Sequence, residues 1–197
     1  DARDYDVELR ECCRGHVIRI ATALFPLLDN LGVTWWADYG TLLGAVRNPM
    51  TTWADYPWLP PEGRSTAGPA AGIIPHDKDA DIGFVLNGDW RRIVRIKSAL
   101  TRSKVSVAMT LRRGSMKVRA SRMNHTNIDV FGWNTRAGGT MYRPGYAQVD
   151  RYKGRVFPES MLFPLATVEW EGMIIPAPRD PEAFLAMRYG PDWRTPI

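Results

Sequence analysis

Apolar side chains recur at helical spacing near the start of the chain and then give way to a short apolar run. Over residues 7–30 this spacing predicts a helix. Pro26 is expected to kink or divide the helix, because proline lacks the amide hydrogen that a helix interior needs. Gly32 supplies a stop signal, after which residues 33–39 indicate a short buried strand. Gly40-Thr41 follows as a turn, and residues 42–46 are typical of the opening of a second helix.

The rest of the chain alternates strand and helix patterns. Residues 79–86 alternate apolar and polar positions, which predicts a strand, and a helix is expected to begin at Asp89. Further strands are expected at residues 104–111, 116–120 and 128–133, the first two joined by a turn near Gly114. The Gly/Pro-rich residues 138–145 indicate a loop. Residues 168–175 indicate a hairpin turning at Glu171-Gly172, and a helix is expected from Asp180-Pro181 to Tyr189, where Gly190 stops it.

Residues 48–73 differ from the rest because proline, glycine and tryptophan punctuate them. Such composition disfavours regular structure, and a loop this long is either a functional lid or disordered. The tryptophans favour a packed, partly ordered loop, from which Trp53, Tyr56 or Trp58 could stack on a sugar or a base. No internal repeat is visible. We therefore expect residues 1–197 to form a single α+β domain with a mixed sheet and helices at both ends of the chain.

Composition narrows the choice of partners. The 197 residues carry a net charge of +5 and give a pI near 9.4, which favours an anionic ligand such as a phosphate. No nucleic-acid partner is expected, since no run of adjacent Lys or Arg exceeds two residues. No membrane segment is expected either, because no uninterrupted apolar stretch approaches the length of a membrane helix. The start at Asp1 is typical of an excised piece, so the compartment stays open: the Golgi lumen for a eukaryotic chain that lost an anchor, or the cytoplasm for a bacterial one.

The sharpest chemical signal is a run of alternating aspartates before and within the expected strand at residues 79–86. Asp79 and Asp81 share one strand face about 7 Å apart, and Asp77 joins them if the extended conformation reaches back that far. Carboxylates on one face repel, and a hard divalent cation such as Mg²⁺ or Mn²⁺ removes the conflict. The alternative is a solvated strand edge. An EF-hand calcium loop is excluded, because that motif needs Gly at its sixth position and Glu at its twelfth. Counting from Asp77, these positions hold Ile82 and Gly88.

Two further elements fit the same chemistry. Gly40 allows close backbone approach to a phosphate, and Thr41 adds a hydroxyl donor or a helix cap, although a structural turn explains this pair equally. Asp129 interrupts an apolar strand and needs a partner, either the shared metal or an arginine. Asp129 or Asp77 is the candidate general base, with His76 as another. Candidate phosphate contacts, for which a solvated basic edge is the alternative, are Arg47, Lys117, Arg119 and Arg122.

A Gly-Thr turn, an Asp-x-Asp strand and a later single Asp together resemble the polymerase-β type of nucleotidyltransferase. The sequence more closely resembles the LicD/fukutin family, over residues 38–47, 74–84, 127–131 and 175–193. This resemblance implies a nucleotidyltransferase-like mixed sheet with flanking helices. Under it, Asp79, Asp81 and Asp129 would bind the metal, and Gly40 and Thr41 would cradle the donor phosphate.

The activity that the resemblance implies is transfer of a phospho-alcohol, either phosphocholine or a polyol phosphate. The donor would be a nucleotide-diphospho-alcohol, often CDP-linked, and the acceptor a glycan or glycoconjugate hydroxyl. Three features depart from the family pattern: His76 before the acidic run, Lys78 between carboxylates, and the long connection at residues 48–73. Two alternatives stay open, namely nucleotidyl transfer to a small molecule or RNA, and a non-catalytic nucleotide- or glycan-binding domain.

Overall fold

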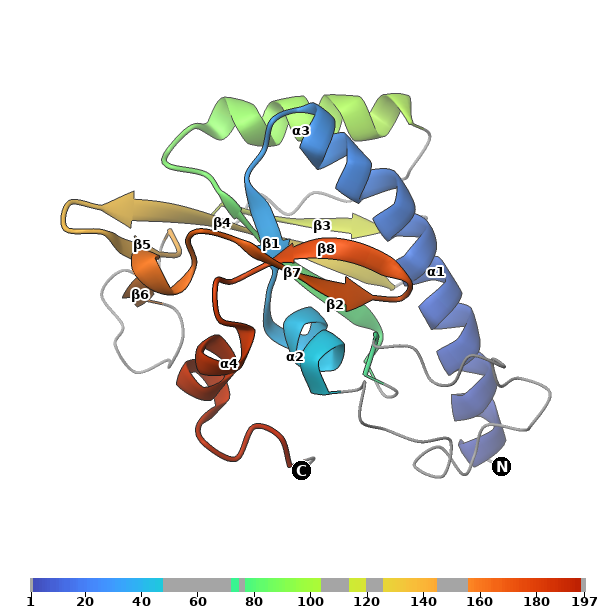
Figure 1. The fold of residues 1–197 in the computed structure, drawn as a ribbon. Helices are drawn as coiled ribbons and strands as arrows, with labels where there is room; N and C mark the ends of the chain where they lie inside the picture. The colour runs from blue at the N-terminus through green and yellow to red at the C-terminus, as the bar shows by residue number, and fades with distance from the viewer. Residues whose placement is uncertain are drawn as a thin grey trace.

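A single mixed sheet organises the domain (Figure 1). The computed structural model describes residues 2–47, 72–74, 77–103, 114–119, 126–144 and 156–195, with side chains from residue 15 onward. In this part of the chain six strands form the sheet, in the order β1-β2-β4-β5-β6 with β3 paired to β4. The strands are β1 (Trp35–Ala37), β2 (Asp79–Val85), β3 (Ser115–Arg119), β4 (Asn127–Arg136), β5 (Thr140–Tyr142) and β6 (Val156–Pro158). Among the strands of the described residues only β2 and β4 pair in parallel, so the expected α+β class with a mixed sheet is confirmed.

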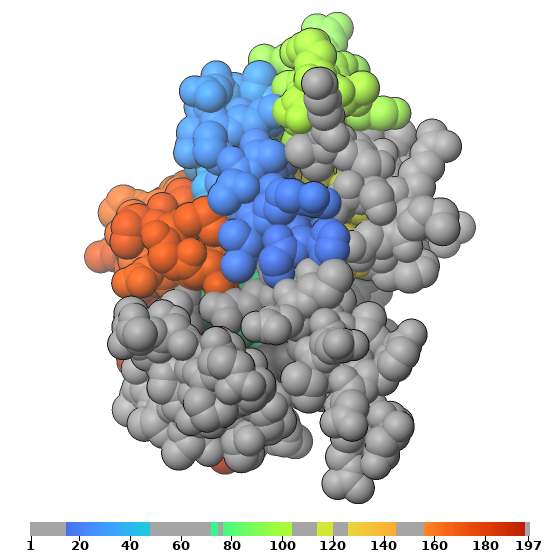
Figure 2. All heavy atoms as spheres, turned by 90° about the vertical axis from the view of Figure 1, so that its right-hand side faces the viewer, coloured from blue at the N-terminus to red at the C-terminus, as the bar shows by residue number. Residues whose placement is uncertain are grey.

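Helices lie on both sides of this sheet. In Figure 1, α1 and α3 cover one face, and α2 and α4 lie on the other. The helices are α1 (Ala2–Asn30), α2 (Tyr39–Arg47), α3 (Trp90–Arg102) and α4 (Pro181–Tyr189). A separate hairpin, β7 (Ala166–Trp170) and β8 (Met173–Ala177), packs beside β1, and a 3-10 turn spans Glu159–Met161. Figure 2 shows the described part of α1 (blue) between α3 (green) and this hairpin (orange).

The main core lies between the sheet and the α1–α3 layer. Over residues 80–84 of β2 and 128–130 of β4, the even-numbered side chains are almost fully buried: Ala80, Ile82, Phe84, Ile128 and Val130. Because successive strand residues point to opposite faces, the odd-numbered side chains of β2 and β4 project toward α2 and α4. That face is apolar as well where Trp133 is fully buried, and its polar side chains include those of Asp79, Asp81 and Asp129.

The first elements differ from expectation in two places. α1 continues through Pro26 as one helix rather than dividing there, since the apolar Leu24 and Leu28 on either side are both buried in the core, and a kink at Pro26 stays a prediction. The strand expected over residues 33–39 is shortened to β1, and Tyr39 already belongs to α2. Tyr39 adopts a positive φ of 38°, a conformation that apolar patterning does not reveal.

Later elements show where patterning succeeds and where it fails. The hairpin turn at Glu171-Gly172 is confirmed, and so is α4, whose N-cap Asp180 accepts a hydrogen bond from the Ala183 amide at 3.0 Å. Residues 138–145 are not all loop, because β5 forms within them by pairing with β4 and with β6, a strand that the sequence did not indicate. The strand expected at 104–111 and residues 48–71 of the expected loop lie outside the described residues. Among the residues that are described, no helix has both the length and the apolar character needed to cross a bilayer.

Candidate functional site

Three aspartates meet on the face of the sheet that looks toward α2 and α4. Asp79 and Asp81 lie on β2, and Asp81 is the direct parallel partner of Asp129 on β4. Neighbouring strands lie about 4.8 Å apart, so the carboxylates of Asp81 and Asp129 leave the sheet side by side. We call Asp79, Asp81 and Asp129 the acidic row. The prediction that these three residues lie together is confirmed by the register of β2 and β4.

The turn that begins α2 is hydrogen-bonded to Asp81. The Gly40 amide donates to Asp81 Oδ2 at 3.1 Å, and the Asp81 amide donates to Thr41 Oγ1 at 2.7 Å. A Cβ on Gly40 would lie 3.0 Å from Asp77 Oδ2 and 3.3 Å from Asp81 Oδ2. Glycine is therefore the residue that lets this turn approach both carboxylates, which also brings Asp77 to the row. The phosphate-cradling role of Gly40 and Thr41 stays a prediction.

Burial and mutual repulsion make the acidic row hard to ionise fully. Burial, followed by the charges of Asp79 and Asp129, raises the pKa of Asp81 well above the ordinary aspartate range. Burial also raises the pKa of Asp129, against the opposing effect of Lys117. A site built only for stability would not collect these groups, because each carboxylate disfavours the charge of its neighbours. The row is therefore suited to a ligand that brings positive charge.

Basic side chains border the row on β3, the strand that pairs with β4. Lys117 is the antiparallel partner of Asp129, and its Nζ donates to Asp129 Oδ2 at 3.0 Å. Arg119 lies two residues further along the same strand, opposite Asn127. Arg47, in contrast, lies at the far end of α2, about 10 Å along the helix from the Gly40 turn. The phosphate-binding roles of these three cations stay predictions, and Arg122 and His76 lie outside the described residues.

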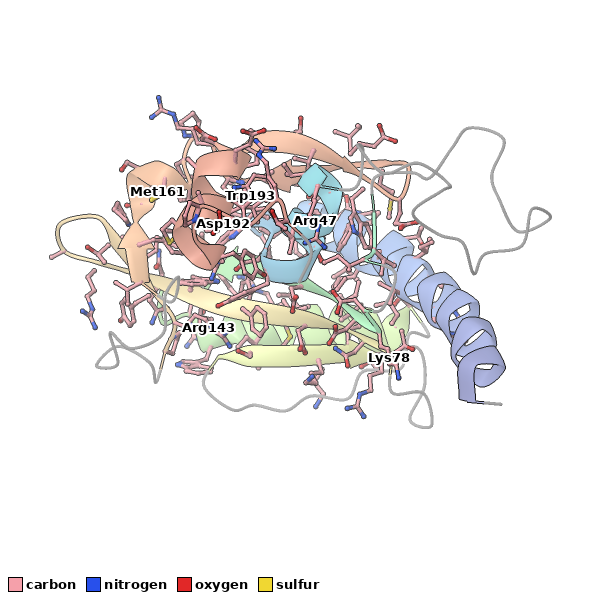
Figure 3. All side chains as sticks on the ribbon, turned by 90° about the horizontal axis from the view of Figure 1, so that it is seen from below. Arg47, Lys78, Arg143, Met161, Asp192 and Trp193 are labelled. Carbon is pink, nitrogen blue, oxygen red and sulfur yellow. The ribbon has the colours of Figure 1, made fainter. Side chains whose placement is uncertain are left out.

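Sequence reasoning missed an arginine that the fold brings to this face. Arg143 follows β5; its Nη1 donates to Tyr39 Oη at 3.4 Å and its Nη2 to Ser115 Oγ at 3.3 Å. The guanidinium lies 3.9 Å from the ring centroid of Phe131, two residues after Asp129. Its charge lowers the pKa of Asp129, opposing the larger effect of burial. Figure 3, seen from the α2–α4 side, places Arg143 and Lys78 toward opposite ends of this face. No sequence signal marks Arg143, because it lies in a Gly/Pro-rich stretch without periodicity.

A second missed group comes from α4, near the C-terminus. Arg188 forms an ion pair with Asp38, the residue before α2, and its guanidinium lies 3.9 Å from the Tyr39 ring centroid. Burial, together with the nearby charges of Asp81 and Asp38, raises the pKa of the Tyr189 phenol, which the charge of Arg188 opposes. Residues from both ends of the chain therefore meet at the acidic row. Their separation in sequence hides this from any local pattern.

The carboxylate oxygens of the acidic row suit a hard divalent cation that also binds phosphate oxygens. Its side chains offer carboxylate oxygens, the ligands that Mg²⁺ and Mn²⁺ prefer, and Asp79 and Asp129 are partly open to solvent. Across the described ranges, no group of three or more Asp, Glu, His or Cys side chains is arranged so that it could hold a metal ion. In the row, Asp129 accepts a hydrogen bond from Lys117, and Asp81 accepts one from the Gly40 amide. A cation bound here would therefore need oxygen ligands from a bound substrate as well. The acidic row therefore suits an ion that is shared with a bound substrate better than an ion held by protein side chains alone.

Comparisons with known proteins agree with this geometry. A family model described as "LicD/FKTN/FKRP, nucleotidyltransferase domain" matches residues 69–180, which include the acidic row. The chain is 25% identical over 184 residues to the proteins named ribitol 5-phosphate transferase FKRP from Homo sapiens and from Mus musculus. These matches cover 91% of this chain but only 32% of each relative, so the chain spans about a third of their length.

Among solved structures, the chain is similar to a lincomycin-bound crystal structure of the lincosamide antibiotic adenylyltransferase LnuA. The identity is 15%, the TM-score is 0.45, and the match covers 87% of this chain and 85% of that one. The family model is the stronger finding, because it covers more than half of the chain and contains all three carboxylates of the row. The chain therefore belongs to the LicD/FKTN/FKRP family.

Proposed function

We propose that this domain transfers a phospho-alcohol from a nucleotide-diphospho-alcohol, CDP-linked, to a glycan hydroxyl. The observation that carries the proposal is the in-register pair Asp81–Asp129, with Asp79 on the same face and Lys117 beside it. Family membership supports this reaction class, and the relatives' printed name favours a polyol phosphate over phosphocholine as the transferred group. Transfer of phosphate groups depends chiefly on positioning and on neutralising charge, which acidic and basic side chains on one face can provide.

In the proposed reaction, the acceptor hydroxyl oxygen forms a bond to the phosphorus that carries the alcohol. The bond from that phosphorus to the bridging oxygen breaks, and the nucleoside monophosphate leaves. The hydroxyl proton passes to a carboxylate, for which we propose Asp129. Its side chain is only 15% exposed and its pKa is raised, so it accepts a proton more readily than an ordinary aspartate near neutral pH.

Asp79, Asp81 and Asp129 would hold the divalent cation, Mg²⁺ or Mn²⁺. When bound, such a cation neutralises charge on the donor diphosphate and on the leaving oxygen. Lys117 and Arg119 on β3 would contact the donor phosphates from the other side of β4. We add Arg143 to this set, because its guanidinium lies on the same face and its charge lowers the pKa of Asp129.

The test is release of nucleoside monophosphate from a panel of nucleotide-diphospho-alcohols. We expect release that requires a glycan acceptor and Mg²⁺ or Mn²⁺, that stops on addition of a chelator, and that is fastest with a CDP-linked polyol. Mass spectrometry of the acceptor should show addition of the phospho-alcohol alone. Appearance of the nucleotide on the acceptor would support nucleotidyl transfer instead. Donor binding without any turnover, and indifferent to the cation, would support a non-catalytic domain.

Replacing Lys117 by methionine is expected to shift the pH dependence of transfer. The Lys117 ammonium lowers the pKa of Asp129, so its loss lets burial raise that pKa further. A carboxylate that must be ionised then ionises only at higher pH, and the acid limb of the kcat/KM profile moves to higher pH. Lys97→Met, which removes an exposed lysine of α3, is the matched control and should leave the limb in place. An unmoved acid limb in K117M would exclude Asp129 as the group that sets it.

A further inference from the structure

A fully buried ion pair lies behind the turn that contacts Asp81. Arg188 Nη2 on α4 lies 2.5 Å from Asp38 Oδ1, and the two side chains are only 1% and 0% exposed. Removing two charges from water is costly, and a well-packed apolar pair is often as stable or more stable. Asp38 Oδ2 is also buried and has no hydrogen-bond partner among the described residues, which adds to the cost. Stability alone therefore gives little reason for this pair.

The pair instead fixes an unusual backbone conformation. Asp38 Oδ1 accepts a hydrogen bond from the Tyr39 amide at 2.9 Å, and the Arg188 guanidinium stacks on the Tyr39 ring at 3.9 Å. Tyr39 has a φ of 38°, a region that a bulky side chain adopts only when its surroundings hold it there. Arg188 thus holds both the main chain and the side chain of the strained residue.

That conformation sets the position of Asp81. The Asp38 amide donates to the Asp81 carbonyl at 3.1 Å, and the Gly40 amide donates to Asp81 Oδ2 at 3.1 Å. Tyr39 lies between these two donors, so a change in its φ would move one donor relative to the other. A continuous chain of contacts therefore runs from Arg188 through Asp38 and Tyr39 to the carboxylate of Asp81.

We propose that Arg188 is a positioning residue for the acidic row, acting through Asp38 and the Tyr39–Gly40 turn to hold the Asp81 carboxylate for cation and donor phosphate. This inference rests on the proposed function for its kinetic readout but not for its binding readout. Both Asp38 and Arg188 lie outside residues 69–180, the part of the chain that the family model matches. In this proposal, α4 completes a site whose carboxylates come from the central sheet.

The test compares Arg188→Lys and Arg188→Met with a matched control on the same part of the chain. Arg194 also pairs with an acid, its Nη2 lying 2.5 Å from Glu182 Oε2, and its guanidinium stacks 4.5 Å from the Trp193 ring centroid. Both members of that pair are about half exposed. Arg194→Met therefore removes the same kinds of contact without touching the Tyr39–Gly40 turn.

Two readouts are measured on protein shown by circular dichroism to be folded. Calorimetric binding of Mn²⁺ alone should weaken about tenfold in the Arg188 variants, the loss typical of removing support behind a ligand. With donor and acceptor, kcat should fall about 100-fold while the KM for the donor changes little, because a misplaced carboxylate costs most in the transition state. Arg194→Met should match the parent protein in both readouts.

If the single variants do not fold, the double variant Asp38→Asn/Arg188→Met distinguishes a purely structural role of the pair from a positioning role. It removes both buried charges together, so a purely structural pair predicts recovery of stability, Mn²⁺ affinity and kcat. The positioning role predicts recovery of stability alone. Folded Arg188 variants with parental Mn²⁺ affinity and kcat would overturn this inference and leave the proposed function intact. A parent protein that neither binds Mn²⁺ nor transfers a phospho-alcohol would instead overturn the proposed function.

Discussion

Replacing Asp81 by asparagine is expected to abolish transfer while making the metal-free protein more stable. Asparagine is nearly isosteric and can still accept the Gly40 hydrogen bond, so the turn is preserved. It loses the charge that would hold the cation, and a loss of about 10³-fold in kcat is expected for such a group. It also relieves the repulsion from Asp79 and Asp129, which should raise the free energy of unfolding by about 1 kcal/mol.

The stability gain should depend on pH in a defined direction. Because the pKa of Asp81 is raised in the folded state, the unfolded chain loses this proton first as pH increases. The parent protein therefore loses stability relative to D81N from about pH 4 upward, and the difference reaches its maximum above the raised pKa. Below about pH 4 both proteins carry a neutral side chain there, and the difference should vanish.

Thermal unfolding without metal, paired with activity in Mg²⁺ or Mn²⁺, checks both parts of this prediction. At neutral pH the midpoint of D81N should lie about 2–4 °C above that of the parent protein. Asp192→Asn, which neutralises an exposed aspartate near the C-terminus, is the control and should change neither quantity. Full activity in D81N would refute the role of the acidic row, and a lowered midpoint would refute the electrostatic account of Asp81.

Replacing Gly83 by alanine is expected to destabilise the fold and to disturb the site together. A Cβ at this position would lie 2.4 Å from Cε2 and Cζ2 of Trp36, whose ring is fully buried. Trp36 cannot move away freely, since it packs against Trp133 with ring centroids 6.3 Å apart. Overpacking of this kind should cost about 3 kcal/mol.

The unfolding midpoint of G83A should therefore fall by about 6–12 °C in thermal unfolding. Gly83 follows Asp81 by two residues on β2, so we also expect reduced kcat below the unfolding range. Gly15→Ala is the matched control, because Gly15 lies in α1, where no atom of the described residues beyond its chain neighbours and the local helix backbone lies within 4 Å of a new Cβ. Alanine should stabilise that helix by about 0.5–1 kcal/mol. A midpoint in G83A equal to that of the parent would mean that Trp36 does not fill this space.

The sequence by itself determined those features that depend on residues close together in the chain. The two-residue period of a strand placed Asp79 and Asp81 on one face, and the amphipathic spacing after Asp89 predicted α3. Likewise, Asp180-Pro181 and Gly190 marked the two ends of α4, and Glu171-Gly172 marked the hairpin turn. In each case the cause is local, since steric preference and capping act over a few residues.

The site required contacts between distant parts of the chain, which only the tertiary structure decided. The pairing of Asp81 with Asp129 depends on the register between β2 and β4, and the short strands β5 and β6 exist only because they pair. The Asp38–Arg188 pair joins residues that no spacing rule connects. Local sequence patterns indicate which face of a helix or strand is apolar. Which strand or side chain it then pairs with depends on the free energy of burial and of charge interactions in the assembled domain. The sequence therefore determined which carboxylates could act together, and the fold decided which neighbours position them.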